Sequence, residues 1–450
     1  MLIYYSVTNY KSFKGKTEFS MISRKDDSSN LSHVYKHYPI PLLKTTAIYG
    51  YNAAGKTNLL DSILKLRRIV VGKIKLRSND DLMYYKMDES SVNNPTVFEI
   101  EFYSSTGNHY SYYLSVLQLT IVGEWLAVID DSNNEPSYLF IREKTNNQTK
   151  LKVPLYDNDE KEKIRMEVYA DELNKTDNIP FIRYGVEHGL SFLDEAYSWF
   201  EDTLEVVKPN AHYIQEISFL NDERTKRIAV QMLSFFELGI EDIRIKTIPL
   251  DNLFFDDNGN SPVDEIKQKY ESTGKPVILR KNGQEYSIFK DSSGNFVAGR
   301  IVTVHRNNIE FELKEESMGT QMLLELIPGF VSSIVYGKVF LFDELESNKH
   351  PEMTKELLTI YQIAGENTPG QIIFTTHECH LLDLHLLRKD EIWFAERDKE
   401  GASHIYSLSD FQPTYNKEDI KTGYLKGQFS EIPFFSNPKN LSWHGNTETD

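Results

Sequence analysis

The sequence predicts an α/β fold in which buried parallel strands and helices form a core, with an antiparallel β meander and a mixed insertion attached. Three short apolar segments predict the core, because strands buried on both faces of a parallel sheet lack alternation; they are residues 45–49, 338–342 and 371–376. Residues 96–130 alternate apolar and polar positions in strand fashion, first at 96–103 and then at 110–116 after a Ser-Ser-Thr-Gly-Asn turn, which indicates the meander. Residues of about 155–240 show helical periodicity, with amphipathic helices expected at residues 192–200 and 228–236. Residues 243–313 return to short strands separated by turns, such as the one expected at residues 256–259.

The first apolar strand leads into a glycine-containing loop that fits the P-loop pattern G-x-x-x-x-G-K-[ST]. The loop reads Gly50-Tyr51-Asn52-Ala53-Ala54-Gly55-Lys56-Thr57, followed by Asn58 and an amphipathic helix start. Backbone N–H groups of such a loop cradle phosphates, and the two glycines permit the close approach that a Cβ hinders. We expect Lys56 to reach the β- and γ-phosphates and the Thr57 hydroxyl to bind Mg²⁺. The predicted ligand is therefore a nucleoside triphosphate.

The second apolar strand ends in two acids, Asp343 and Glu344. A buried strand followed by an acidic loop is common, but after a P-loop this arrangement is the Walker B pattern. Asp343 is expected to bind Mg²⁺ directly or through water. Glu344 is expected to orient or deprotonate the attacking water.

The third apolar strand ends in His377. Ligands of open α/β sheets bind outside the carboxyl ends of the strands, so His377 is expected to face the γ-phosphate or the water near Glu344. The run His377-Glu378-Cys379-His380 lacks the i,i+4 histidine spacing of a helical zinc site, and a fourth ligand is not evident. We expect no metal there, and we expect Cys379 to be a buried small residue.

A Ser-x-Gly sequence, Ser317-Met318-Gly319, precedes a strongly apolar helix. The N-terminus of that helix is a candidate anion site. It is equally a candidate N-cap, in which Ser317 or Thr320 satisfies free N–H groups. Both roles can hold together.

Composition limits the classes of partner. The chain has 450 residues, one cysteine and a formal net charge of −17. The acidic balance disfavours a broad, sequence-independent grip on nucleic acid, and the cysteine count favours a reducing compartment. No apolar run approaches the ~20 residues of a membrane span, and the start of the chain reads as a strand rather than a signal peptide. A cytoplasmic location without a membrane partner is expected.

The order of these motifs resembles the ATPase head of ABC-type proteins, in the RecF/SMC-like branch. More closely, the chain resembles AAA-domain ATP-binding proteins of bacterial defence islands, such as RloA-like, AriA-like and abortive-infection ATPases. The residues that carry the resemblance are Asn9-Tyr10-Lys11-Ser12-Phe13, residues 50–59, Glu316-Ser317-Met318-Gly319-Thr320, Asp343-Glu344 with His350-Pro351, Thr376-His377, residues 423–429 and Ile432-Pro433.

The resemblance implies an ABC-ATPase-type P-loop NTPase head in three parts. Residues 1–150 form its N-terminal half, residues 151–313 a helical and mixed insertion, and residues 314–450 its C-terminal half. It also implies that ATP with Mg²⁺ is bound between two chains of a head-to-tail homodimer or larger oligomer, which hydrolysis to ADP and phosphate opens.

The resemblance also implies roles for individual residues. Ser317 and Gly319 complete the partner's site in trans, opposite Lys56, while Lys11 and Ser12 lie near the nucleotide. Two positions depart from the ABC signature: Met318 replaces its second glycine and Glu316 its leucine.

Three functions remain open. The first is a nucleotide-switched sensor or scaffold in anti-phage defence with a separately encoded nuclease or toxin, because residues 378–450 show no nuclease-like cluster of acids. The second is a RecF-like DNA-repair ATPase with nucleic acid as a partner, and the third is a transporter motor, against which the altered signature and long insertion argue. The second depends on a basic run for which a solvated helix face is the favoured explanation: Lys65, Arg67, Arg68, Lys73, Lys75 and Arg77.

Overall fold

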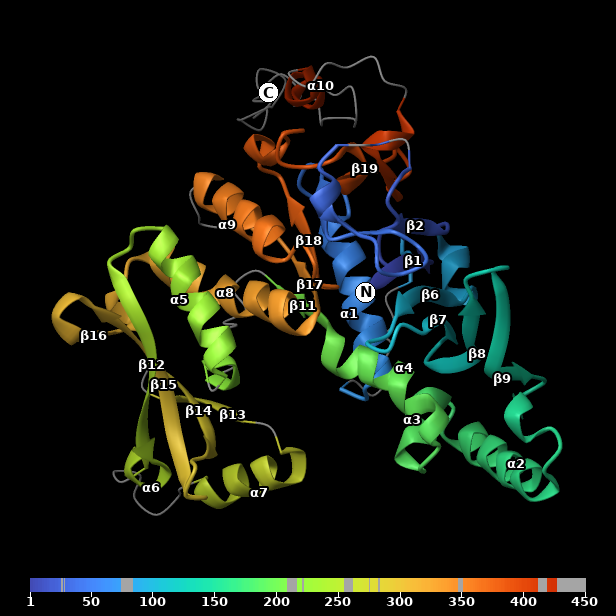
Figure 1. Cartoon of the computed structure of the whole chain (residues 1–450). Helices are drawn as coiled ribbons and strands as arrows, with labels where there is room; N and C mark the ends of the chain where they lie inside the picture. The colour runs from blue at the N-terminus through green and yellow to red at the C-terminus, as the bar shows by residue number, and fades with distance from the viewer. Residues whose placement is uncertain are drawn as a thin grey trace, which may run out of the picture.

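The computed structural model describes residues 1–25, 27, 29–73, 84–208, 217–220, 222–254, 262–274, 276–281, 284–346, 351–411 and 419–426. A six-stranded central sheet has the order β11-β17-β18-β5-β19-β20 and is parallel except for β20 (Figure 1). Its strands are β5 (Thr45–Tyr49), β11 (Leu204–Val207), β17 (Val339–Phe342), β18 (Gln371–Thr376), β19 (Ile392–Arg397) and β20 (Ser403–Ser407).

Helices cover both faces of this sheet, which explains why every residue of the central strands β5, β17 and β18 is buried. Ile48 of β5 belongs to the hydrophobic core on the side of α1 (Lys56–Val70). Its neighbours Ala47 and Tyr49 belong to the opposite core, with α8 (Met318–Tyr336) and α9 (Pro351–Ala364). The last described helix is α10 (Asp419–Leu425), whose Tyr424 stacks on Phe394.

A second, antiparallel sheet has the order β10-β9-β8-β7-β6-β1-β2 and shares the core of α1. Its strands are β1 (Leu2–Thr8), β2 (Thr17–Ser20), β6 (Thr96–Tyr103), β7 (His109–Leu117), β8 (Thr120–Asp130), β9 (Glu135–Thr145) and β10 (Gln148–Lys152). The predicted meander therefore continues through β10 and pairs with the start of the chain. A small hairpin, β3 (Val34–Tyr35) with β4 (Leu42–Leu43), lies between β2 and β5 in the chain.

The insertion forms a lobe on the side of the central sheet away from the meander (Figure 1). It combines an antiparallel sheet with helices. These elements are α5 (Glu223–Phe235), β12 (Ile240–Pro249), α6 (Leu250–Leu253), α7 (Val263–Thr273), β13 (Val277–Lys281), β14 (Gln284–Lys290), β15 (Phe296–His305) and β16 (Ile309–Glu312). The predicted turn at residues 256–259 lies outside the described residues.

The domain boundary expected at residue 151 does not separate two hydrophobic cores. The next helices, α2 (Glu160–Lys175), α3 (Phe181–Glu187) and α4 (Asp194–Ser198), contribute to the core of α1 and the meander. Strand β11 then joins the central sheet beside β17. The structural insertion consequently begins after β11. The amphipathic helix expected at residues 192–200 is divided between a 3₁₀ turn, α4 and a π-helical turn at Trp199–Thr203.

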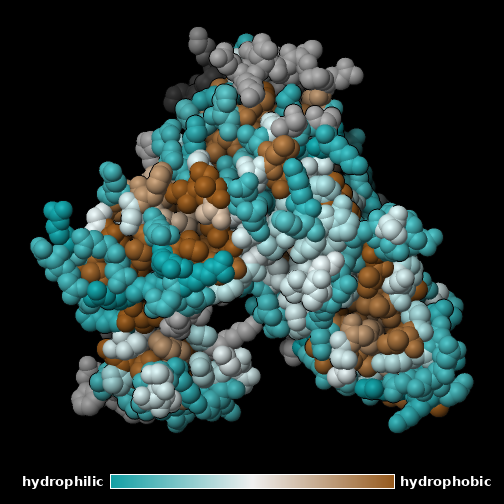
Figure 2. Space-filling view, viewed as in Figure 1, coloured by the Kyte–Doolittle hydropathy of each residue, from teal (hydrophilic) through white to brown (hydrophobic). Residues whose placement is uncertain are grey.

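Helix α8 is the one described helix long and apolar enough, by length and composition, to cross a membrane. In its most apolar window 67% of the residues are buried inside the protein, so the helix serves as a core element on one face of the central sheet. Figure 2 shows a surface that is largely hydrophilic, with apolar side chains gathered around α8 and α9.

His109 gives the meander a pH-dependent contact. The buried ring has Nδ1 2.7 Å from Asp131 Oδ1 and Nε2 3.6 Å from Glu101 Oε2. Burial lowers the pKa of His109, but the two carboxylates outweigh it and hold the pKa above its ordinary value. The folded chain therefore binds this proton more tightly than the unfolded chain.

Below a pH of about 6.5, the pKa of histidine in the unfolded chain, we expect this contact to make its full contribution to the stability of the fold. That contribution is lost as the pH rises through the pKa of His109 in the folded chain, which is higher. His109→Gln should reduce the fall in the free energy of unfolding across that window, because glutamine does not titrate. Urea unfolding of both proteins at several pH values measures this difference. Parallel pH profiles would contradict the assignment.

Candidate nucleotide site

The predicted P-loop connects β5 to α1 and depends on both glycines. Gly50 and Gly55 have φ values of 156° and 111°. A Cβ on Gly50 would lie 2.6 Å from the carbonyl oxygen of Ala395, and one on Gly55 would lie 2.7 Å from the Cβ of Ser403. Side chains at these positions would push the loop away from β19 and β20, so the loop conformation requires glycine.

Lys56 forms hydrogen bonds across the P-loop. Its Nζ donates hydrogen bonds to the carbonyl oxygens of Gly50, at 2.6 Å, and Tyr51, at 3.1 Å. Burial lowers the pKa of Lys56, and the nearby carboxylates, first among them Glu346, oppose that shift. The cationic group therefore lies at the base of the loop, where a phosphate chain would meet it.

An open cavity of about 680 Å³ lies over the P-loop, within the usual size of small-molecule sites. Most of the predicted nucleotide residues line it: Lys11, Ser12, Asn52, Ala53, Ala54, Gly55, Lys56, Thr57, Asn58 and Glu344. Sequence reasoning missed the rest of the wall, which is Tyr84, Tyr85, Lys86, Met87, Arg397 and Gly401. These residues come from the chain after α1 and from the β19–β20 hairpin, and no motif marked them.

Lys11 and Ser12 are fixed to α1. Lys11 Nζ lies 2.7 Å from Asp61 Oδ2, and Ser12 Oγ accepts a hydrogen bond of 2.8 Å from Asn58 Nδ2. Asp61 also receives Lys208 Nζ at 2.6 Å, and its hydrogen-bonded cations outweigh burial and lower its pKa to about 2. The early segment predicted to lie near the nucleotide is thus adjacent to the P-loop helix.

Asp343 and Thr57 come together at the carboxyl edge of the central sheet. Thr57 Oγ1 donates to Asp343 Oδ1 at 3.1 Å, and Thr375 Oγ1 donates to the same oxygen at 2.6 Å. Burial raises the pKa of Asp343, and the neighbouring Glu344 raises it further. A hydroxyl beside a buried carboxylate is an all-oxygen set of the kind that suits Mg²⁺.

Glu344 follows Asp343 with an unusual backbone. Its φ of 52° is in the left-handed region, which non-glycine residues adopt rarely and at a cost in free energy. Its N–H donates to Thr375 Oγ1 at 2.8 Å, which holds the turn against β18. The turn places Glu344 in the cavity wall beside the P-loop.

His377 follows β18, but it does not line the cavity. Its backbone N–H donates to Glu346 Oε1 at 2.9 Å, and its Nδ1 lies 3.1 Å from the same oxygen. The partner of His377 in this structure is therefore Glu346 and not the region of Glu344. Sequence reasoning missed Glu346, although the third acid in Asp343-Glu344-Leu345-Glu346 was a visible signal.

Ser317 caps α8 as expected, because its Oγ accepts from the N–H of Thr320 at 3.2 Å. Neither Ser317 nor Gly319 lines the P-loop cavity of its own chain. The segment faces solvent: Met318 is 64% exposed, and a Cβ built on Gly319 meets no atom within 4 Å. Glu316, which replaces the signature leucine, accepts from His305 Nε2 at 2.7 Å and so attaches the segment to β15.

The basic run after the P-loop does not form a solvated face throughout. Arg67 is buried, and its guanidinium donates to the carbonyl oxygen of Phe200 and to Glu205 Oε1, both at 2.8 Å. The expectation of a solvated side chain was wrong for Arg67, because this residue lies on the face of α1 that packs against β11. Lys75 and Arg77 lie outside the described residues.

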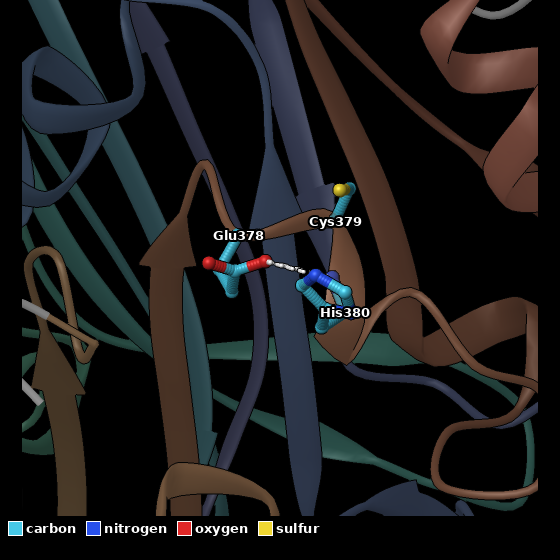
Figure 3. Close-up of side chains that lie close together, drawn as sticks. All are labelled: Glu378, Cys379 and His380. Atoms are coloured by element: carbon cyan, nitrogen blue, oxygen red, sulfur yellow. Dashed lines mark hydrogen bonds and ion pairs between the residues drawn. The ribbon is translucent and has the colours of Figure 1, made fainter. Parts of the chain in front are cut away.

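Glu378, Cys379 and His380 bring their ligand atoms within 4.8 Å of one another (Figure 3). His380 Nδ1, however, lies 3.0 Å from Lys421 Nζ, a cation that opposes a metal ion at this place. Cys379 is half-buried, where a buried residue was predicted. His350, part of the motif beyond Asp343 and Glu344, lies outside the described residues.

A family model described as "AAA domain, putative AbiEii toxin, Type IV TA system" matches residues 45–383, more than half of the chain. The chain belongs to this AAA-domain family. It is accordingly an AAA-type ATPase with an α/β fold, in which a P-loop follows a strand of the central sheet and an antiparallel meander and a mixed insertion are attached. No curated protein matches the sequence.

Several solved structures are similar to the chain. An Smc head bound to the C-winged helix domain of ScpA is 13% identical, with a TM-score of 0.47 over 90% of this chain and 97% of that chain. The SMC head domain from Thermotoga maritima is 11% identical, with a TM-score of 0.40 over 90% and 98%. An Smc head with an extended coiled coil, bound to the C-terminal domain of ScpA derived from Pyrococcus furiosus, is 13% identical, with a TM-score of 0.42 over 94% and 98%.

Proposed function

We propose that this protein binds ATP with Mg²⁺, hydrolyses it to ADP and phosphate, and acts as a nucleotide-switched sensor or scaffold in a bacterial anti-phage defence system. The observation that carries the proposal is the convergence of P-loop and Walker B residues on one cavity. Thr57 and Asp343 are in hydrogen-bond contact there, and Glu344 lines the same wall as Lys56.

The residues of this site have different roles. Residues of the P-loop from Gly50 to Asn58 bind the triphosphate through backbone N–H groups, with Lys56 neutralising its charge. Thr57 and Asp343 hold Mg²⁺, which neutralises charge that develops on the phosphates. Glu344 orients or deprotonates the attacking water, and Lys11 and Ser12 contact the nucleotide from the side of the early segment.

ATP binding is also coupled to the association of two chains. The exposed Ser317 and the half-buried Gly319 at the N-terminus of α8 complete the ATP site of a second chain in a head-to-tail homodimer or larger assembly. A helix N-terminus favours the γ-phosphate, and loss of that phosphate on hydrolysis opens the contact. The position of this segment, exposed and away from its own cavity, supports a role in trans.

The description of the family, which names a toxin and a toxin–antitoxin system, supports a role in defence with a separately encoded effector, a nuclease or toxin. We place the activity in the cytoplasm. A RecF-like role in DNA repair is the alternative, but it relied on the basic run in which Arg67 is buried.

Glu344→Gln tests this proposal. We expect it to retain ATP affinity, to hydrolyse ATP at least about 100-fold more slowly, and to accumulate as an ATP-dependent dimer, because glutamine cannot accept the water proton. Phosphate release and light scattering after gel filtration measure the two effects. Glu366→Gln, at an exposed acid, should behave as the parent. Parent-like hydrolysis by Glu344→Gln would overturn the assignment of Glu344, and a parent protein that neither binds nor hydrolyses ATP would overturn the proposed function.

A further inference from the structure

Glu346 is a buried acid at the edge of the nucleotide site. Its side chain is 6% exposed, and its Oε1 accepts the backbone N–H of His377 while lying 3.1 Å from the Nδ1 of that residue. Its second oxygen, Oε2, has no hydrogen-bond partner among the described residues. Removing a carboxylate from water without satisfying both oxygens is unfavourable, so this arrangement reduces stability rather than adding to it.

The backbone around Glu346 is set against β18. The N–H of Glu344 donates to Thr375 Oγ1 at 2.8 Å, and the N–H of Leu345 donates to the carbonyl oxygen of Thr375 at 3.2 Å. Glu346 then reaches His377, two residues further along. The segment that carries Glu344 and the segment that carries His377 therefore run side by side, and Glu346 makes a further contact between them.

The contact determines which nitrogen of His377 is free. A carboxylate is negatively charged and only accepts hydrogen bonds, so Glu346 Oε1, 3.1 Å from Nδ1, favours a proton on that nitrogen. Nε2 then remains available, and the side chain of His377 is 54% exposed. Within the described residues, Nε2 has no partner that competes with a ligand.

We propose that Glu346 is a positioning residue of the ATPase site, which holds His377 in the Nδ1–H form so that Nε2 is the nitrogen presented to the reacting phosphate. This inference rests on the proposed function, and it adds to that function the role near the γ-phosphate that the sequence analysis expects of His377. Glu346 acts through His377 and not on the nucleotide. The carboxylate that activates water remains Glu344.

Two other roles for Glu346 give different results. If it served as an independent base, its loss would add to the loss of His377. If it mainly stabilised the Lys56 ammonium, which its charge does more strongly than Asp343 or Glu344, its loss would raise the KM for ATP. A positioning role predicts a lower kcat with KM unchanged.

The first experiment is a double-mutant cycle on ATP hydrolysis with Glu346→Ala, His377→Ala and the double variant. We expect Glu346→Ala to lower kcat by about 10- to 100-fold, as removal of the orienting partners of metal-bound histidines does, with KM changed less than about twofold. The double variant should be no slower than His377→Ala alone. Additive losses, or a loss confined to KM, would overturn the proposal.

Matched variants make the cycle specific. Glu346→Gln keeps the size of the side chain and one oxygen acceptor, so it should recover part of the rate if Glu346→Ala folds poorly. Glu378→Gln changes the acid next to His377 that instead accepts the backbone N–H of His380, and it should leave kcat unchanged. Equal losses in Glu346→Gln and Glu378→Gln would overturn the proposal.

The second experiment does not require turnover. Nitrogen-15 NMR of the histidines, with the His377 signals assigned from His377→Gln, should show the Nδ1–H form in the parent. The form should shift toward Nε2–H in Glu346→Ala. An unchanged tautomer would overturn the role of Glu346 even if ATP hydrolysis is observed. A changed tautomer in a protein without ATPase activity would instead place the failure in the proposed function.

Discussion

Replacing Lys56 with alanine is expected to weaken ATP binding by at least about 100-fold. Hydrogen bonds from a charged group contribute about 1.5–3 kcal/mol each, and each 1.4 kcal/mol changes affinity tenfold. The variant loses the ammonium that meets the triphosphate. It also leaves the carbonyl oxygens of Gly50 and Tyr51 without their present donor, so the loop is less well organised before ATP arrives.

Isothermal titration with ATP and Mg²⁺ measures the loss directly. Lys14→Ala is the matched control, because Lys14 lies close to the predicted early contact Lys11 but is exposed and pairs with Asp88 at 3.0 Å. It should bind ATP as the parent does. Affinity within tenfold of the parent in Lys56→Ala would mean that the cavity binds its ligand without the P-loop lysine, against the proposed function.

The central strands and their terminal residues could be predicted because their signals are local. β5 has the bounds expected from residues 45–49, and β6 has those expected from residues 96–103. An apolar run next to Gly50 or Asp343 needs no knowledge of distant residues. The rule that ligands bind at the carboxyl ends of parallel strands then brings these motifs to one edge of the sheet.

The parts that could not be predicted depend on contacts between distant segments. The Glu346–His377 contact joins residues 31 positions apart, and its geometry follows from the left-handed turn at Glu344. Arginine is usually solvated, which is why Arg67 was expected at the surface, but β11 and the turn before it cover that side of α1. The break of the helix expected at residues 192–200 accompanies Trp199, which stacks on Phe102 of the meander at 4.0 Å.

A buried acid explains why residues 151–207 belong with the meander. Glu124 of β8 is fully buried and accepts hydrogen bonds from the backbone N–H groups of Phe181, at 2.6 Å, and Ile182, at 3.0 Å. It thus satisfies the free N–H groups at the N-terminus of α3. Its charge partner is Arg142, which is also buried and lies 3.5 Å away. Burial raises the pKa of Glu124, and Arg142 and the two N–H groups oppose that shift.

Glu124→Ala is therefore expected to lower the free energy of unfolding by about 3–5 kcal/mol, the usual result of removing one partner of a buried ion pair. The charge of Arg142 and the N–H groups of α3 would remain buried without their acceptor. Urea unfolding followed by tryptophan fluorescence suits the measurement, because Trp125 is adjacent in β8 and Trp199 lies in the same core.

The exposed Glu143→Ala on neighbouring β9 serves as the control and should change stability by less than about 0.5 kcal/mol. Replacing both partners, as Glu124→Leu with Arg142→Met, should recover much of the loss, because two apolar groups leave no uncompensated charge. A loss below about 1 kcal/mol in Glu124→Ala would mean that α3 and β11 are held to the meander by apolar packing alone. In that case the contacts of Trp199 and Phe200 with the strands would carry the connection between the two parts of the head.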